Sequence, residues 1–232
     1  MATEHEKFSV SVIVPVYNGE AFLREAIQSI QRQDWGAAEI VIVDDGSTDR
    51  TGEIATGFGD IVRYVQQPNL GAAAARNRGI KMAVGSVIAF LDADDLWLEH
   101  TLSLQLQVLQ ANPSLQMVRG HTRRIHRVAV PSGASQWGSL GEAWPALSLG
   151  SAIMRKPVFD RVGYLDESLA FNEDVDWFMR AKETGIATML HGEVVQLYRR
   201  HEHNITNNRV LNRTSFLRTL KNTIERRRNN GE

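Results

Sequence analysis

The stretch Val87-Ile88-Ala89-Phe90-Leu91-Asp92-Ala93-Asp94-Asp95 decides the fold of this chain. Its first five residues are apolar and begin with two β-branched side chains, a pattern typical of a strand buried on both faces of a sheet. Three carboxylates follow within four positions. Because carboxylates this close repel one another, they favour a hard divalent cation bound through oxygen, or a turn in which Asp94 or Asp95 caps a helix beginning near Leu96. The stretch alone leaves both interpretations open.

The residues around this stretch repeat the pattern of an apolar strand followed by an amphipathic helix. Strands are predicted over residues 10–16, 39–43, 61–65 and 87–91, and helices over 22–34, up to about residue 56, over 72–82 and over 98–111. Strands and helices that alternate at this spacing predict an α/β fold in which helices cover both faces of a mostly parallel sheet.

The second half of the chain is less regular. Its patterns predict one or two strands over 117–130, a loop over 131–145, helices over 156–162 and 173–184, and two strands within 188–198. A final helix over 209–228 carries Leu217, Leu220 and Ile224 on one stripe among many basic residues. Such a basic face is typical either of a solvated helix or of one that contacts a membrane surface, and both readings stay open.

Composition bounds the class of protein. A chain of 232 residues is long enough for one large domain, and we expect one. The net charge of -1 gives no reason to expect a nucleic-acid partner, and the absence of cysteine excludes disulfides and thiolate chemistry. No apolar signal segment or membrane-spanning window is visible, so we expect a cytoplasmic protein, or one peripheral on the inner face of the membrane.

Three short segments that carry polar residues lie at the ends of predicted parallel strands. The segments are Pro15-Val16-Tyr17-Asn18, Asp44-Asp45-Gly46-Ser47 and Asp92-Ala93-Asp94-Asp95. Each could be a turn or a helix cap by itself. Ligands of open parallel sheets bind beyond the carboxyl ends of the strands, and turn chemistry does not require three polar strand ends on one edge. Together the three segments predict a ligand site there.

The order of these motifs resembles glycosyltransferase family 2, which has the GT-A fold. The resemblance covers about residues 9–200 and rests on Val-Ile-Val-Pro-Val-Tyr-Asn-Gly (12–19), Val-Asp-Asp-Gly-Ser-Thr-Asp (43–49), Asn-x-Gly-x-x-x-Ala-Arg-Asn-x-Gly (69–79), Phe-Leu-Asp-Ala-Asp-Asp (90–95) and Asn-Glu-Asp-Val-Asp-Trp (172–177). It implies a single GT-A domain made of a Rossmann-like nucleotide-sugar-binding half (8–115), a smaller mixed acceptor-binding half with the catalytic base (116–205) and a basic C-terminal helix and tail (206–232).

The implied activity is transfer of a sugar from a nucleotide diphosphate sugar, with UDP favoured, to a hydroxyl group, with inversion and with bound magnesium or manganese. By this resemblance, the catalytic residues are Asp174, as general base, and Glu173. The nucleotide-sugar-binding residues are Pro15, Val16, Tyr17, Asp44, Asp45, Arg76, Asp92 and Ala93. The metal ligands are Asp94, with Asp95 as a second ligand or a cap, and His201.

Several alternatives remain at this stage. The acceptor could be a glycan, a lipid-linked saccharide or a protein, and the oligomeric state is open. The cluster from Arg123 to Arg127 fits a phosphorylated acceptor or the alternating charge of an edge strand. A GT-A-like binding module without activity is a second class of function. A sugar nucleotidyltransferase is a third, although its glycine- and arginine-rich loop is missing from Tyr17-Asn18-Gly19-Glu20.

Overall fold

The computed structural model describes residues 8–37, 39–129, 135–202, 204–207 and 209–229. Its strands are β1 (Val10–Val16), β2 (Glu39–Asp44), β3 (Val62–Gln66), β4 (Val87–Phe90), β5 (Leu96–Trp97), β6 (Met117–Ala129), β7 (Ser135–Ser139), β8 (Ala152–Arg155) and β9 (Thr188–Arg200). The helices are α1 (Leu23–Gln31), α2 (Thr51–Thr56), α3 (Ala72–Met82), α4 (Thr101–Ala111), α5 (Val158–Val162), α6 (Glu173–Glu183) and α7 (Arg209–Asn229). Short 3₁₀ turns lie at Gly59–Ile61, Leu149–Ser151 and Ile205–Asn207.

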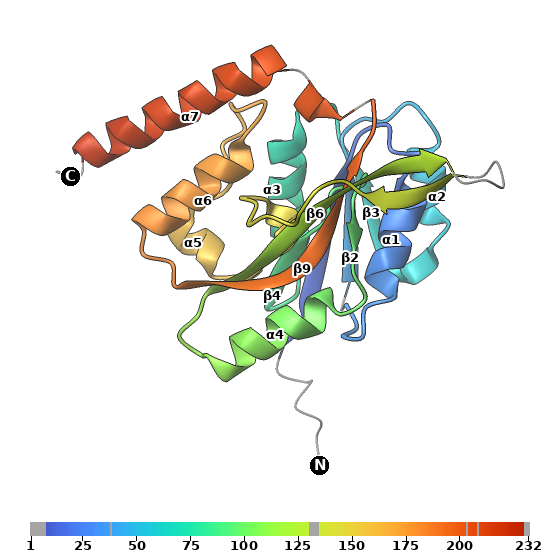
Figure 1. The fold of residues 1–232 in the computed structure, drawn as a ribbon, viewed down its shortest axis with the longest axis horizontal. Coiled ribbons are helices and arrows are strands. Elements are labelled where there is room, and N and C mark those ends of the chain that lie inside the picture. The colour runs from blue at the N-terminus through green and yellow to red at the C-terminus, as the bar shows by residue number, and fades with distance from the viewer. Residues whose placement is uncertain (1–7, 38, 130–134, 203, 208, 230–232) are drawn as a thin grey trace.

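The described strands form one sheet in the order β3-β2-β1-β4-β8-β6-β9-β5, and β7 pairs with β6 (Figure 1). The pairs β1–β2, β1–β4 and β2–β3 are parallel, as predicted for the first half. In the second half β8 is antiparallel to both of its neighbours, whereas β6 and β9 run parallel over most of their length. The predicted α/β class with a parallel-dominated sheet is confirmed.

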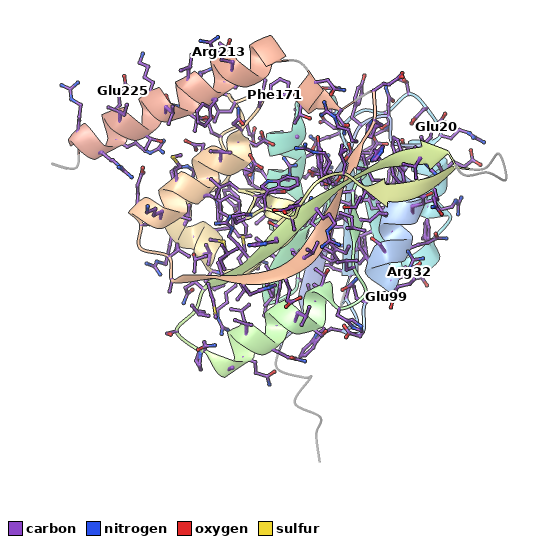
Figure 2. The ribbon with its side chains drawn as sticks, viewed as in Figure 1. Glu20, Arg32, Glu99, Phe171, Arg213 and Glu225 are labelled. Atoms are coloured by element: carbon purple, nitrogen blue, oxygen red, sulfur yellow. The ribbon has the colours of Figure 1, made fainter. Side chains whose placement is uncertain are left out.

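Apolar residues alternate between two cores, one on each face of the sheet. Val12 and Val14 of β1 lie in one core and Ile13 lies in the other, and the same alternation continues in β2 and β4. Helices α1, α2 and α4 contribute to the first core, and α3, α5 and α6 to the second. Figure 2 shows side chains filling the space between the sheet and these helices. A continuous apolar run therefore encodes a strand that is covered on both sides.

Helix α3 packs unusually close to the sheet. A side chain added at Gly79 would place its Cβ 2.4 Å from Cγ2 of Ile13, so only glycine fits there. Asn77 of the same helix exchanges hydrogen bonds with the backbone of Leu165, which precedes α6. This packing fixes the position of Arg76, the residue that precedes Asn77 on the same helix.

Several predictions for the second half are wrong. Residues 188–200 form one strand and not two, because β9 follows β6 through two register shifts instead of turning back. Residues 135–139 form β7, where a loop was predicted; residues 130–134 lie outside the described part of the chain. The cluster from Arg123 to Arg127 is not on an edge strand, since β6 has β9 on one side and β7 or β8 on the other.

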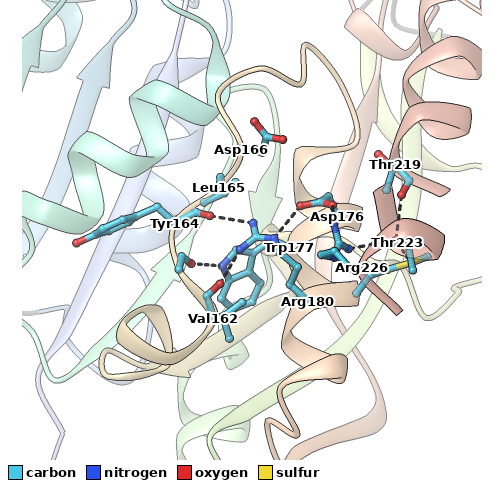
Figure 3. Close-up of polar contacts among 12 residues, drawn as sticks. Val162, Tyr164, Leu165, Asp166, Asp176, Trp177, Arg180, Thr219, Thr223 and Arg226 are labelled. Atoms are coloured by element: carbon cyan, nitrogen blue, oxygen red, sulfur yellow. Dashed lines mark hydrogen bonds and ion pairs between the residues drawn. The ribbon is translucent and has the colours of Figure 1, made fainter. Parts of the chain in front are cut away.

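Helix α7 packs on α6 through polar contacts. The guanidinium of Arg226 lies 3.0 Å from Oδ1 of Asp176 and 3.0 Å from Oε2 of Glu183, and Asp176 also pairs with Arg180 (Figure 3). Thr219 and Thr223 are the α7 side chains buried most deeply. Among the described residues, no helix is long and apolar enough to cross a membrane.

Candidate functional site

The loops after β1 and β2 hold each other in place. The backbone N–H of Asn18 donates to Oγ of Ser47 at 2.8 Å, and Oδ1 of Asn18 accepts from the N–H of Thr48 at 2.8 Å. Asn18 has a φ of 50°, a conformation that asparagine tolerates better than most residues. Tyr17 is 54% exposed beside this contact, whereas Pro15 and Val16 are buried in the end of β1. The predicted base-binding segment therefore presents its tyrosine to solvent at the carboxyl edge of the sheet.

The two aspartates after β2 differ in their partners. Asp44 is fully buried, and its carboxylate accepts from the N–H of Ser47 at 2.7 Å and from the hydroxyl of Tyr64 at 2.7 Å. The carboxylate of Asp45 accepts from the side chain of Gln67 and from the backbone N–H groups of residues 70 and 71 at 2.8–2.9 Å. Asp44 closes its own turn, whereas Asp45 ties that turn to the loop before α3.

Arg76 connects the end of β4 to the start of α6. It is 7% exposed, its guanidinium lies 2.6 Å from Oδ1 of Asp92, and it also pairs with Oε1 of Glu173. Burial opposes the charge of Arg76, but the two carboxylates outweigh burial and raise the pKa of Arg76. Contact between Arg76 and the nucleotide stays a prediction; within the described part of the chain, Arg76 pairs with Asp92 and Glu173.

Asp174 stands beside this chain of charges in the first turn of α6. It is half-buried, and Oδ1 accepts from the N–H of Val175 at 2.7 Å. Burial, together with the neighbouring charge of Glu173, raises the pKa of Asp174 to about 7, although the charge of Arg76 opposes this rise. The residue before Glu173 is Asn172, which has a φ of 59°. Strained backbone of this kind persists where the surrounding structure holds it, often at functional sites.

The remaining carboxylates of the β4 loop contact the end of β9. Oδ2 of Asp94 lies 3.1 Å from Nε2 of His201 and 3.2 Å from Nδ2 of Asn204, and the ring of His201 stacks on Phe22. The Asp94 side chain is 34% exposed. The structure thus brings together two of the three predicted metal ligands from residues 107 positions apart.

The carboxylate of Asp95 is buried against β9 and does not cap a helix. It is 1% exposed, Oδ1 accepts from the N–H of Arg199 at 3.0 Å and Oδ2 from Nε2 of Gln196 at 2.6 Å. The prediction that Asp94 or Asp95 caps a helix near Leu96 is wrong, because Leu96 and Trp97 form β5 against β9 and α4 begins only at Thr101.

Arg199 is the main residue of the site that sequence reasoning missed. Its side chain is fully buried and donates to the backbone carbonyls of Phe22, Ala93, Asp94 and Asp95, and it pairs with Glu25 at 2.5 Å. In the sequence, residue 199 follows directly after the strand predicted to end at residue 198 and begins a polar run, which is the one signal that could have indicated it. Arg199 therefore shapes the backbone of the loop that carries Asp92 and Asp94.

The donor set at Asp94 suits a divalent cation that is shared with a ligand. No group of three or more histidine, aspartate or glutamate side chains that could hold a metal ion occurs among the described residues. Magnesium usually takes one or two carboxylates and completes its coordination with water and substrate phosphates. One exposed carboxylate with an imidazole beside it fits this pattern.

The sheet topology and the polar strand ends define a GT-A-type α/β protein, and comparisons with known proteins agree. The sequence profile of glycosyl transferase family 2 matches residues 11–163. An uncharacterized glycosyltransferase of Rickettsia typhi is 30% identical over 211 residues, which cover 85% of this chain and 66% of the relative. The uncharacterized glycosyltransferase EpsJ of Bacillus subtilis is 30% identical over 215 residues, which cover 85% of this chain and 62% of the relative. The chain belongs to glycosyl transferase family 2.

Solved structures share the fold. Residues 1–349 of S. aureus TarS, in complex with UDP-GlcNAc, superpose with a TM-score of 0.71 at 24% identity, covering 86% of this chain and 61% of that chain. The mannosyltransferase PcManGT of Pyrobaculum calidifontis, in complex with GDP-Man and Mn²⁺, gives a TM-score of 0.71 at 20% identity, covering 94% of this chain and 64% of that chain. This chain thus spans less than two-thirds of the length of these relatives.

Proposed function

We propose that this protein transfers a sugar from a nucleotide diphosphate sugar to a hydroxyl group of an acceptor, in the synthesis of a glycan or glycoconjugate. One observation carries the proposal. A carboxylate with a pKa of about 7, Asp174, lies next to Glu173, which Arg76 links to Asp92 at the carboxyl edge of the sheet. A general base works best when its pKa lies near the operating pH. Arg76 therefore connects the proposed sugar-donor site, at Asp92, to the turn that carries the proposed catalytic base, Asp174.

Asp174 is the base in this proposal. Inverting transfer requires a group on the far side of the sugar that accepts the proton of the attacking hydroxyl, and a carboxylate at a helix start can do so. Glu173 is bound to Arg76 and supports the position of this turn. Because Glu173 already has a cationic partner, we assign it to positioning and Asp174 to proton transfer.

The donor site lies along the ends of β1, β2 and β4. Asp45 and the exposed Tyr17 are proposed to contact the base, Pro15 and Val16 support that pocket, and Asp92 is proposed to bind the ribose. The nucleotide diphosphate sugars in two GT-A neighbours, UDP-GlcNAc and GDP-Man, support this class of donor. We retain UDP as the favoured nucleotide, since a carboxylate such as that of Asp45 can accept from the N–H of uracil.

Asp94 and His201 are proposed to hold a magnesium or manganese ion. A divalent cation supplies positive charge that neutralises the diphosphate leaving group. Mn²⁺ in the GDP-Man complex of PcManGT supports such a metal in this fold. Asp44 and Asp95 are 0% and 1% exposed, and both carboxylate oxygens of each accept from protein donors, so we assign them to loop support. Asp45 also accepts from protein donors but keeps 5% exposure at the end of its strand, so we retain it for contact with the base.

Contact of α7 with a membrane surface stays a prediction. It is supported by the exposure of Phe216, Leu217 and Ile224, which are 42–59% exposed on a helix rich in arginine. Arg213 and Glu225, labelled in Figure 2, lie on the same helix. Anionic lipids attract such a surface through its charge.

The decisive experiment measures nucleotide release from a panel of nucleotide sugars in the presence of Mn²⁺ or Mg²⁺. We expect one donor to be hydrolysed slowly without acceptor, and Asp174→Asn to lower transfer by about 10²–10⁴-fold while donor affinity is unchanged. Asp60→Asn, on an exposed turn, is the matched control. Cation-dependent nucleotide binding without any release would favour an inactive binding module, and release of diphosphate from a nucleoside triphosphate would favour a nucleotidyltransferase.

A further inference from the structure

A cavity of about 470 Å³ lies between α6, α7 and the starts of β6 and β9. Its walls are mainly apolar and include Met117, Phe178, Met179 and Ile186. None of the residues proposed for the donor site, the base or the metal lines it. On α6 its lining begins at Phe178, four residues after Asp174, which places it about 6 Å or more further along the helix.

The cavity contains an arginine whose charge has no carboxylate partner among the described residues. Arg119 donates to the carbonyl of Ala146 at 2.5 Å, its guanidinium lies 4.9 Å from the ring centre of Phe178, and its Nε has no hydrogen-bond partner. Burial lowers the pKa of Arg119, and no neighbouring charge opposes this effect.

Four other arginines in buried or half-buried positions pair with carboxylates, whereas Arg78 and Arg155 donate to backbone carbonyls. Arg76, Arg180, Arg199 and Arg226 each pair with at least one carboxylate at 3.0 Å or less. A cation removed from water without a counter-charge is costly to the folded state. Arg119 lacks the counter-charge that these four arginines have, its Nε has no partner and it lines a cavity, so an anion from outside the chain would supply the missing charge.

Two further cations stand at the same cavity. Lys182 is exposed and forms no ion pair within the described part of the chain, and Arg227 lies 3.8 Å from Glu183 with half of its side chain exposed. No lining residue is acidic. The cavity thus combines positive charge with apolar walls, and its volume is in the range of small-molecule sites.

We propose that this cavity binds an anion joined to an apolar group, with the anion on Arg119, Lys182 and Arg227 and the apolar group against Met117, Phe178 and Ile186. A free inorganic anion would satisfy the cations but leave the apolar walls in contact with water. A neutral apolar molecule would cover the walls but leave Arg119 without a counter-charge. Only a ligand with both parts fits the described lining.

The test uses octyl phosphate as the probe, with inorganic phosphate and octanol as its two separate parts. Calorimetry on the full chain should give octyl phosphate an affinity at least about tenfold higher than either part. Arg119→Gln should weaken octyl phosphate binding by about 10–100-fold, since a charge-assisted hydrogen bond is lost. Arg123→Gln, an exposed change on the same strand, should leave binding unchanged.

Further measurements keep the inference open to refutation. Lys182→Gln, at an exposed position, should leave stability nearly unchanged and weaken binding by a smaller factor, and UDP should not compete with octyl phosphate. Competition by UDP would place the anion in the donor site and overturn the inference. Equal binding of inorganic phosphate, equal binding of octanol, or no effect of either substitution would also overturn it. None of these results depends on whether the protein transfers sugar.

Discussion

Two buried arginines connect the halves of the molecule in opposite directions. Arg76 belongs to α3 in the first half and reaches Glu173 at the start of α6. Arg199 belongs to β9 in the second half and reaches the loop that follows β4 in the first. Each half therefore carries a cation that organises the polar residues of the other.

The two arginines differ in what they bind. Arg76 binds two side-chain carboxylates, which can move and exchange partners when a ligand arrives. Arg199 binds mainly backbone carbonyls, which cannot titrate, and its one carboxylate partner, Glu25, is 43% exposed. We therefore infer that the Arg76 region controls the charges at the site, whereas the Arg199 region controls its shape. The predictions below test this division.

Replacement of Arg199 should have the largest effect, and the effect should be on folding. Arg199→Met would leave several buried carbonyl groups without donors, and we expect the free energy of unfolding to fall by about 3–5 kcal/mol. Urea unfolding followed by circular dichroism measures this change. Arg200→Met, at the exposed neighbouring position, should cost less than about 0.5 kcal/mol. A fully stable Arg199→Met protein would show that the loop after β4 holds its own shape.

Replacement of Arg76 should act on catalysis more than on stability. Arg76→Gln removes the link between Asp92 and Glu173. We expect the rate of sugar transfer to fall by about 100-fold, because the first turn of α6, which carries Asp174, loses its fixed position. The loss of stability should be smaller than for Arg199, since the Asp92 side chain is 36% exposed and can turn to solvent. Arg78→Gln on the same helix is the control. Equal losses of stability for Arg76 and Arg199 would contradict the proposed division.

The pH dependence of transfer should separate the two regions next. Burial raises the pKa of Asp174 to about 7 from its usual 3.8, and only the ionised form can accept a proton, so activity should rise as pH increases through about 7. Because Arg76 lowers this pKa, the rise should move to higher pH in Arg76→Gln.

Stability should respond to pH with the opposite sign. Folded Asp174 binds a proton that the unfolded chain has already released above pH 3.8, so its contribution to stability is present at low pH and is lost as pH rises through about 7. Asp174→Asn should remove this dependence. An activity profile flat between about pH 6 and 8 would remove Asp174 as the base.

The first half of the fold could be predicted from sequence because its information is local. Five apolar residues in a row, as at positions 87–91, suffice to indicate a strand that is covered on both faces. The second half depends on distant pairing. Leu96 and Trp97 join a sheet only because Leu197 and Gln196 lie opposite, and no local pattern reports a partner 100 residues away. The helix cap was therefore predicted where a strand begins.

The candidate site shows the same limit. Resemblance to a family was enough to predict that His201 and Asp94 belong together, and the structure brings them to 3.1 Å. It did not indicate that the guanidinium of Arg76 is already bound by protein carboxylates or that Arg199 is fully buried. Burial of a charge is decided by which groups surround it in three dimensions, and an arginine in a polar run looks solvated from sequence alone.

Asn204 provides the smallest and sharpest test, because it contacts both kinds of partner. Its amide donates to Oδ2 of Asp94 at 3.2 Å and to the backbone carbonyl of Arg199 at 3.1 Å, and its Oδ1 accepts from the N–H of His201 at 2.6 Å. Asn204→Ala should weaken cation-dependent nucleotide binding by about fivefold, the effect of one typical hydrogen bond, with little change in the transfer rate at saturating donor. Calorimetric titration with nucleotide, with and without Mn²⁺, measures this. A fall in the transfer rate without a change in affinity would mean that the end of β9 acts on the charges of the reaction as well as on the shape of the site.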